Sequence, residues 1–220
     1  MKKVNWLDHI ANLLVVILGI TIAFYLEGYK EEANNRQQEK EYLQSLIEDL
    51  ETDIEALDTL GYVNKRIANA LIKISNATSG APYPKDSLTG FMFGIQYNPP
   101  FAPQRTAYES MKSSGKLDLI SDFELRNEVV ELYEQYYWGT SEFDVSLLNH
   151  INGFVKPYFM ENIVFTGRSS MDEAFLSSSE FRNIIYSYRY LFLAKVDFYE
   201  RVRGEVESTL DLLRAYEEKL

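Results

Sequence analysis

The chain has 220 residues, 46% of them hydrophobic, with no cysteine and a formal net charge of −11. An acidic protein repels phosphate backbones, so we expect no nucleic-acid partner. The lack of cysteine excludes disulfides, thiolate nucleophiles and cysteine-ligated metals.

Residues 10–26 read IANLLVVILGITIAFYL and are apolar except for Asn12 and Thr21. Such a run predicts a membrane-spanning anchor at the short end of the usual length range. Residues 1–9 carry Lys2 and Lys3, whereas the flank after the anchor is acidic. Positive charge stays in the cytoplasm, so we expect a cytoplasmic tail at residues 1–9 and the body on the other, non-cytoplasmic side of the membrane.

A cleaved signal peptide is the alternative interpretation, because Thr21-Ile22-Ala23 resembles a cleavage site. The apolar run continues past Ala23 without a turn residue, which favours a retained anchor. Asn12, Gly19 and Ala23 share one helical face, and Gly19 and Ala23 form a small-xxx-small pair. We therefore predict a membrane-helix packing face there, although small residues are common in any spanning segment.

Residues 27–41 are almost wholly polar and predict a solvated helical stalk. Residues 42–220 are expected to form one extracytoplasmic helical bundle. Its first apolar residues recur in steps of three and four, the pattern of a helix with one buried face. This seam contains Leu43, Ile47, Leu50, Ile54, Leu57, Leu60, Val63, Ile67, Leu71 and Ile74. One helix from the membrane to about Ala77 is predicted.

Residues 79–104 hold five of the six prolines together with many aromatics. This composition predicts a packed loop with a short helix at residues 87–93. A second short helix is expected at residues 105–114, followed by Gly115 as its terminating residue. Ser121-Asp122-Phe123-Glu124 is a capping box that begins a third helix, which Gly139 interrupts or ends.

A further helix is expected from Ser141 towards Phe159. Capping boxes at residues 170–173 and 177–180 precede a long helix that continues to the C-terminus. Its seam contains Ile185, Tyr188, Phe192, Val196, Tyr199, Val206, Leu210, Leu213 and Leu220. No stretch alternates with period two, so the fold class is all-α. The two long helices and the shorter middle helices should form an antiparallel bundle.

The N-terminal layout resembles an uncharacterised bacterial family, a domain of unknown function, of small single-pass, N-terminally anchored membrane proteins. The resemblance covers roughly the first 130 residues and lies in the blocks KKVNW, VVILGITIAF, YLQSLIEDL and TAYESMKSSGKL. It implies the topology and the fold class, and it places the expected anchor in a bacterial inner membrane with the body in the periplasm. It supplies no activity.

Few residues carry recognisable chemistry. His150 is the one histidine in the body, and no ligand spacing accompanies it, so we predict no catalytic residue, no metal site and no cofactor. The best candidate for a functional surface is the basic corner, whose cations and turn groups could hold an anion or a partner's carboxylate. It comprises Arg105, Lys112, Ser114, Gly115, Lys116 and Arg126. The alternative is a purely structural helix–turn–helix corner.

Two aromatic groups are further candidates for a ligand groove or a partner interface, with inter-helix packing as the alternative. They comprise Tyr133, Tyr136, Tyr137, Trp138, Tyr186, Tyr188 and Tyr190. We expect a membrane-tethered interaction or scaffold protein, an accessory subunit of an envelope complex, that contacts the bilayer and a protein partner or itself through the anchor and bundle. The alternative is an extracytoplasmic sensor or ligand-binding module that acts through a membrane partner.

Overall fold

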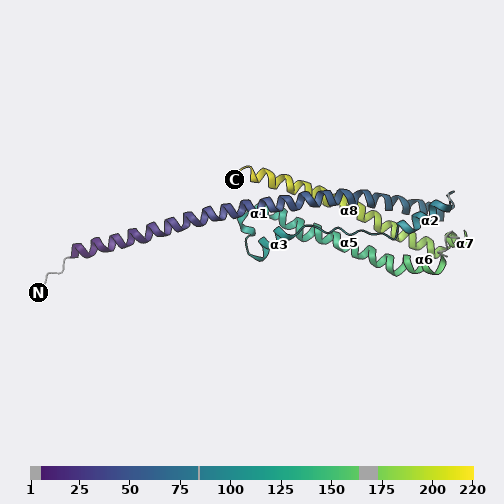
Figure 1. Cartoon of the computed structure of the whole chain (residues 1–220). Helices are drawn as coiled ribbons and strands as arrows, with labels where there is room; N and C mark the ends of the chain where they lie inside the picture. The colour runs from purple at the N-terminus through teal and green to yellow at the C-terminus, as the bar shows by residue number, and fades with distance from the viewer. Residues whose placement is uncertain (1–5, 84, 164–172) are drawn as a thin grey trace.

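The computed structural model describes residues 6–83, 85–163 and 173–220. This described part of the chain is helical with no strand, which confirms the all-α prediction. Helix α1 (Trp6–Thr78) has 73 residues and is therefore roughly 110 Å long. It runs unbroken through the predicted anchor, stalk and first bundle helix, and it extends beyond the bundle at its N-terminal end (Figure 1).

The N-terminal part of α1 is long and apolar enough to cross a membrane, and that stretch is not buried against other parts of the protein. Residues 27–37 are also exposed, and burial begins at Gln38 and Glu39. From Leu43 onward the predicted seam faces the core, with Leu50 and Leu71 fully buried. The long helix predicted from the heptad pattern is thus confirmed.

Helix α8 (Ser179–Glu217) packs along α1 and runs in the opposite direction, which returns the C-terminus to the end of the bundle nearest the exposed part of α1 (Figure 1). Leu220 was expected in its seam, but it lies beyond the end of the helix and is 54% exposed. The residue that caps the start of α8 is Ser178, whose hydroxyl accepts a hydrogen bond from the backbone N–H of Phe181. The predicted cap at Ser177 was one residue early.

The third long element, the middle helix, occupies residues 123–162. It consists of α4 (Phe123–Glu131), η2 (Leu132–Tyr136), α5 (Tyr137–His150), η3 (Ile151–Val155) and α6 (Lys156–Asn162). Its segments η2 and η3 are π-helical. The predicted break at Gly139 is wrong, because the helix continues through it. A Cβ at Gly139 would lie 2.6 Å from Cζ of Phe198, so this glycine allows α8 to approach closely.

The shorter elements are α2 (Lys85–Gly94), α3 (Thr106–Ser113), η1 (Leu117–Leu119) and α7 (Glu173–Ser177). Gly115 ends α3 with φ of 68°, as predicted for a terminating glycine. The cap of the middle helix is Asp122, which accepts from the N–H groups of Glu124 and Leu125, and the predicted cap Ser121 instead contacts the hydroxyl of Tyr216. The capping box predicted at residues 170–173 begins outside the described residues.

The bundle has two apolar clusters along its length. The proximal cluster, nearer the exposed part of α1, includes Leu43, Leu57, Tyr137 and Tyr199. The distal cluster includes Ile67, Leu147, Ile95 and Phe192. Polar side chains separate the two clusters on every long element, and this boundary is the most unusual feature of the interior.

Candidate functional site

The boundary between the clusters is a polar layer, to which each long element contributes. On α8, Lys195 lies between Phe192 of the distal cluster and Tyr199 of the proximal one. The layer comprises Asn64 from α1, Asn98 from the connection after α2, Thr140 and Asp144 from α5, and Lys195 from α8. All except Asn98 are buried. Buried polar groups require internal partners, which determine how the layer is built.

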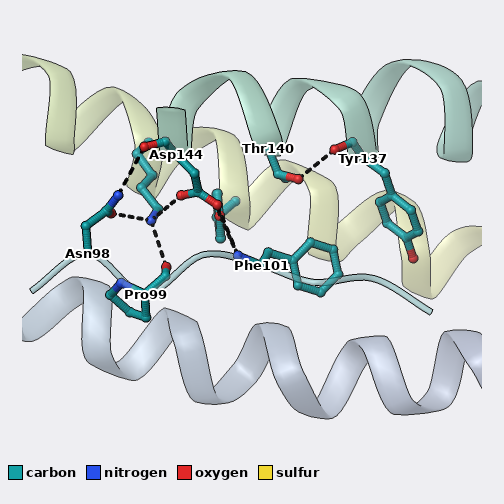
Figure 2. A network of polar contacts seen from close by, with 8 residues as sticks. Asn98, Pro99, Phe101, Tyr137, Thr140 and Asp144 are labelled. Atoms are coloured by element: carbon teal, nitrogen blue, oxygen red, sulfur yellow. Dashed lines mark hydrogen bonds and ion pairs between the residues drawn. The ribbon is translucent and has the colours of Figure 1, made fainter. Parts of the chain in front are cut away.

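Lys195 and Asp144 form the centre of the layer. The Lys195 ammonium lies 2.6 Å from Oδ1 of Asp144, and its side chain is completely buried. It also donates hydrogen bonds to Oδ1 of Asn98 at 2.7 Å and to the carbonyl of Pro99 at 3.1 Å. The ring of Tyr199 lies 4.8 Å from the same nitrogen. Figure 2 shows Asn98, Pro99 and Asp144 gathered around this point.

Burial and ion pairing have opposite effects on the pKa of Lys195. Burial lowers the pKa of Lys195, and the hydrogen bond and charge of Asp144 oppose that shift. A charge in a low-dielectric interior is tolerated only when it is paired and its donors are satisfied, as they are here. The ammonium has contacts to three acceptors and is shielded from solvent, so the geometry fits a structural cation rather than an exposed nucleophile.

The strap is the connection formed by residues 95–105. It makes a turn at residues 95–96 and is neither helix nor strand from 97 to 105, and Figure 2 shows it lying between the middle helix and α1. A segment without helix or strand inside a helical bundle has no regular backbone partners, so its backbone groups need side-chain partners. Asp144 Oδ2 accepts from the N–H of Phe101 at 3.0 Å and from the hydroxyl of Tyr199 at 2.7 Å. Tyr188 donates to the carbonyl of Ile95 at 2.6 Å.

Asp53 of α1 holds the other end of the strap. Its carboxylate accepts from the N–H of Gln104 at 2.9 Å and from the hydroxyl of Tyr137 at 2.6 Å. Burial raises the pKa of Asp53 to about 6, although both hydrogen bonds act to lower it. Asp49, one turn earlier, accepts from the N–H of Ala107 at 3.2 Å. Carboxylates from α1 and α5 therefore fasten the strap on its two sides.

The charged residues of the basic corner have partners within the protein. Arg105 pairs with Glu109, Lys112 with Glu134 at 2.6 Å, and Arg126 with Asp118 at 3.0 Å. Lys116 donates to Oε1 of Gln38 at 2.7 Å, and the Ser114 hydroxyl donates to the carbonyl of Ser110. These contacts join α3 and η1 to α1 and to the middle helix. Anion binding at this corner stays a prediction.

His150 of α5 contacts helix α8. Its Nε2 lies 3.4 Å from the carbonyl of Ile184 and 3.4 Å from the hydroxyl of Ser187, and burial lowers its pKa. Among the described residues, no group of three histidine, aspartate or glutamate side chains is placed to hold a metal ion. Asn12, Gly19 and Ala23 are exposed, as are the other residues from 12 to 37, so the packing face stays a prediction.

The candidate aromatics differ in burial. Tyr133, Tyr137 and Tyr188 are buried in the core and Tyr136 is partly buried, whereas Trp138, Tyr186 and Tyr190 are 61%, 44% and 75% exposed. Sequence reasoning missed the polar layer. The available signal was Lys195, a charge placed between Phe192 and Tyr199 in the apolar seam.

No curated protein and no solved structure matches the chain. A family model, described as a family of unknown function (DUF6090), matches residues 12–185, which include the apolar part of α1, the strap, the middle helix and the start of α8. On this match, the chain belongs to the DUF6090 family of unknown function.

Proposed function

We propose that this protein is a membrane-tethered interaction protein, an accessory subunit of an envelope complex in the bacterial inner membrane. In this proposal residues 10–26 cross the membrane and the bundle lies in the periplasm. The support is the exposed apolar stretch of α1 together with Lys2 and Lys3 before it and acidic residues after it.

The unbroken course of α1 supports a tether of fixed length. Between Leu26 and Gln38 the helix is polar and exposed, and it is internally braced by the ion pair of Glu32 with Arg36 and by the hydrogen bond from Gln37 to Glu41. At 1.5 Å per residue, this stalk would hold the bundle about 18 Å beyond the end of the anchor. It carries no apolar seam, so we expect association to use the anchor or the bundle.

The observation that carries the interaction proposal is a surface on the middle helix that has only one exposed charged side chain. Between residues 135 and 155, the one exposed carboxylate or ammonium group in this described stretch belongs to Glu142. The same stretch exposes Trp138, Val145, Leu148 and Phe154, each by about half or more. Protein interfaces are depleted of charge and enriched in aromatic residues, so this surface, in a chain with 25% charged residues, fits a protein partner.

The test is site-specific photo-crosslinking in native membranes. A photoreactive amino acid at Leu148 should give a defined adduct with one protein, and the same probe at Asn127, an exposed position earlier on the helix, should not. Trp138→Glu should weaken the Leu148 adduct by placing a charge on the surface. Equal labelling from both positions, or an adduct unaffected by Trp138→Glu, would contradict the proposal.

One observation favours a second function, a ligand-binding or sensor module that acts through a membrane partner. A groove of about 420 Å³ opens between α1 and α8 beside the polar layer. Its volume lies in the range of small-molecule sites.

A further inference from the structure

The groove between α1 and α8 is lined by both helices at the level of the polar layer. Leu57, Tyr62 and Val196 supply apolar surface, and Tyr199 connects the groove to the Lys195–Asp144 pair. Asn64 is part of the same lining and is only 1% exposed.

The amide of Asn64 is the unusual group. Neither its Oδ1 nor its Nδ2 has a hydrogen-bond partner among the described residues, and both atoms are buried. A buried amide without partners is unfavourable, whereas an apolar side chain of similar volume would be neutral or stabilising. Asn64 therefore has two unmet requirements, an acceptor for its N–H group and a donor for its oxygen.

Gly61 keeps the groove open. It lies one turn before Asn64 in the lining, and a Cβ at this position would meet no atom within 4 Å. Its φ is not positive, so neither backbone geometry nor packing requires glycine here. Glycine in a helix interior is unfavourable relative to alanine, yet a larger side chain at this position would fill the groove.

The charges at the rim favour a ligand without net charge. Lys65 pairs with Glu200 at 2.8 Å, and Arg203 pairs with Asp58 at 2.5 Å. These four groups sum to zero charge and are mutually neutralised. A free carboxylate would satisfy the Asn64 N–H but leave its oxygen unpaired, and an ammonium would do the reverse. A carboxamide offers both a donor and an acceptor in one plane and can pair with both atoms of Asn64.

We propose that this groove binds a small, net-neutral carboxamide through Asn64, with the walls formed by Leu57, Gly61 and Val196. The site is independent of the proposed interaction surface on the middle helix, so either can fail alone. Because both amide atoms of Asn64 are buried, a ligand reaches them only if a covering side chain moves aside.

The test uses the full-length protein in lipid nanodiscs. Thermal unfolding is measured with L-glutamine and nicotinamide, and with L-glutamate and nicotinate as matched carboxylates, each up to about 10 mM. At least one carboxamide should raise the unfolding temperature in a saturable manner, and its carboxylate should not. Gly61→Leu should weaken the effect about tenfold or more. Gly204→Leu, at an exposed helix glycine on α8 with open space for a side chain, should leave it unchanged.

Asn64→Leu separates the ligand site from a structural role. It should abolish the carboxamide effect while the protein remains folded, because it removes an unpartnered buried amide. If neither carboxamide changes the unfolding temperature of the wild type, or if the change persists in Gly61→Leu or Asn64→Leu, the proposal is overturned and Asn64 holds internal water only.

Discussion

Lys195 of α8 and Asp144 of α5 form an ion pair of 2.6 Å at the level where the two apolar clusters meet. The pair connects three segments, since Asp144 also accepts from the strap at Phe101 and Lys195 donates to the strap at Pro99. Its removal should therefore loosen the strap as well as the contact between helices.

Asp144→Ala should lower the free energy of unfolding by about 3–5 kcal/mol, because it leaves a buried ammonium without its counter-charge. Urea denaturation followed by circular dichroism measures the loss. The matched control is Lys65→Ala, which breaks an exposed pair with Glu200 and should cost about 0–1 kcal/mol. Similar losses of unfolding free energy for both variants would show that the buried pair stabilises the fold no more than the exposed pair does.

Asp53 should make stability depend on pH. Its pKa is about 6 in the folded protein against 3.8 for an exposed aspartate, so the folded state binds the proton more tightly than the unfolded state. This residue's stabilising contribution is therefore complete below about pH 4 and is lost as pH rises through 6, a change of roughly 3 kcal/mol. Asp53→Asn removes the titration.

The measurement compares the free energies of unfolding of wild type and Asp53→Asn at several pH values from 4 to 7. The difference between them should shift by roughly 3 kcal/mol in favour of the variant as pH rises, because wild type must then bury a charge. Parallel curves for the two proteins would show that Asp53 does not titrate differently on folding.

Gly139→Ala should destabilise the bundle by about 1–3 kcal/mol, because the added Cβ would lie 2.6 Å from the ring of Phe198. Gly204→Ala is the control, since it is also within a helix but has open space for the added atom. There the substitution should stabilise by about 0.5–1 kcal/mol. Thermal or urea unfolding should show that the two substitutions change the free energy of unfolding in opposite directions. A change in the same direction for both would contradict the close approach of α8 to the middle helix.

The long helices were predictable because their apolar residues recur at helical spacing, as from Leu43 to Ile74 and from Ile185 to Leu213. The break at Gly139 was mispredicted because a glycine in a helix costs only about 1 kcal/mol, and its reason lies in Phe198, which is distant in sequence. The polar layer was not predicted because it, too, depends on contacts between residues that are distant in sequence. Whether Lys195 meets Asp144 depends on the register of α8 against the middle helix, which local patterns do not specify.

The anchor should act as an association element. Gly19→Leu should reduce crosslinking, to a second copy or to a native partner, more than Val15→Leu does, because Gly19 shares a face with Asn12 and Ala23. Both variants must be expressed equally in membranes. An interhelical hydrogen bond in lipid contributes only about 0.6–2 kcal/mol, so Asn12→Leu alone should have a smaller effect than Gly19→Leu. Equal crosslinking yields for all three variants would show that the face with Asn12, Gly19 and Ala23 does not contribute to association.

The topology of α1 is the central claim, and the absence of native cysteine makes it directly measurable. Asp211→Cys places a thiol on the exposed side of α8, and Asn5→Cys places one before the apolar stretch while Lys2 and Lys3 are kept. A membrane-impermeant maleimide added to intact spheroplasts should label Asp211→Cys at once and Asn5→Cys only after permeabilisation. Labelling of Asn5→Cys in intact spheroplasts, with Asp211→Cys protected until permeabilisation, would contradict the proposed topology.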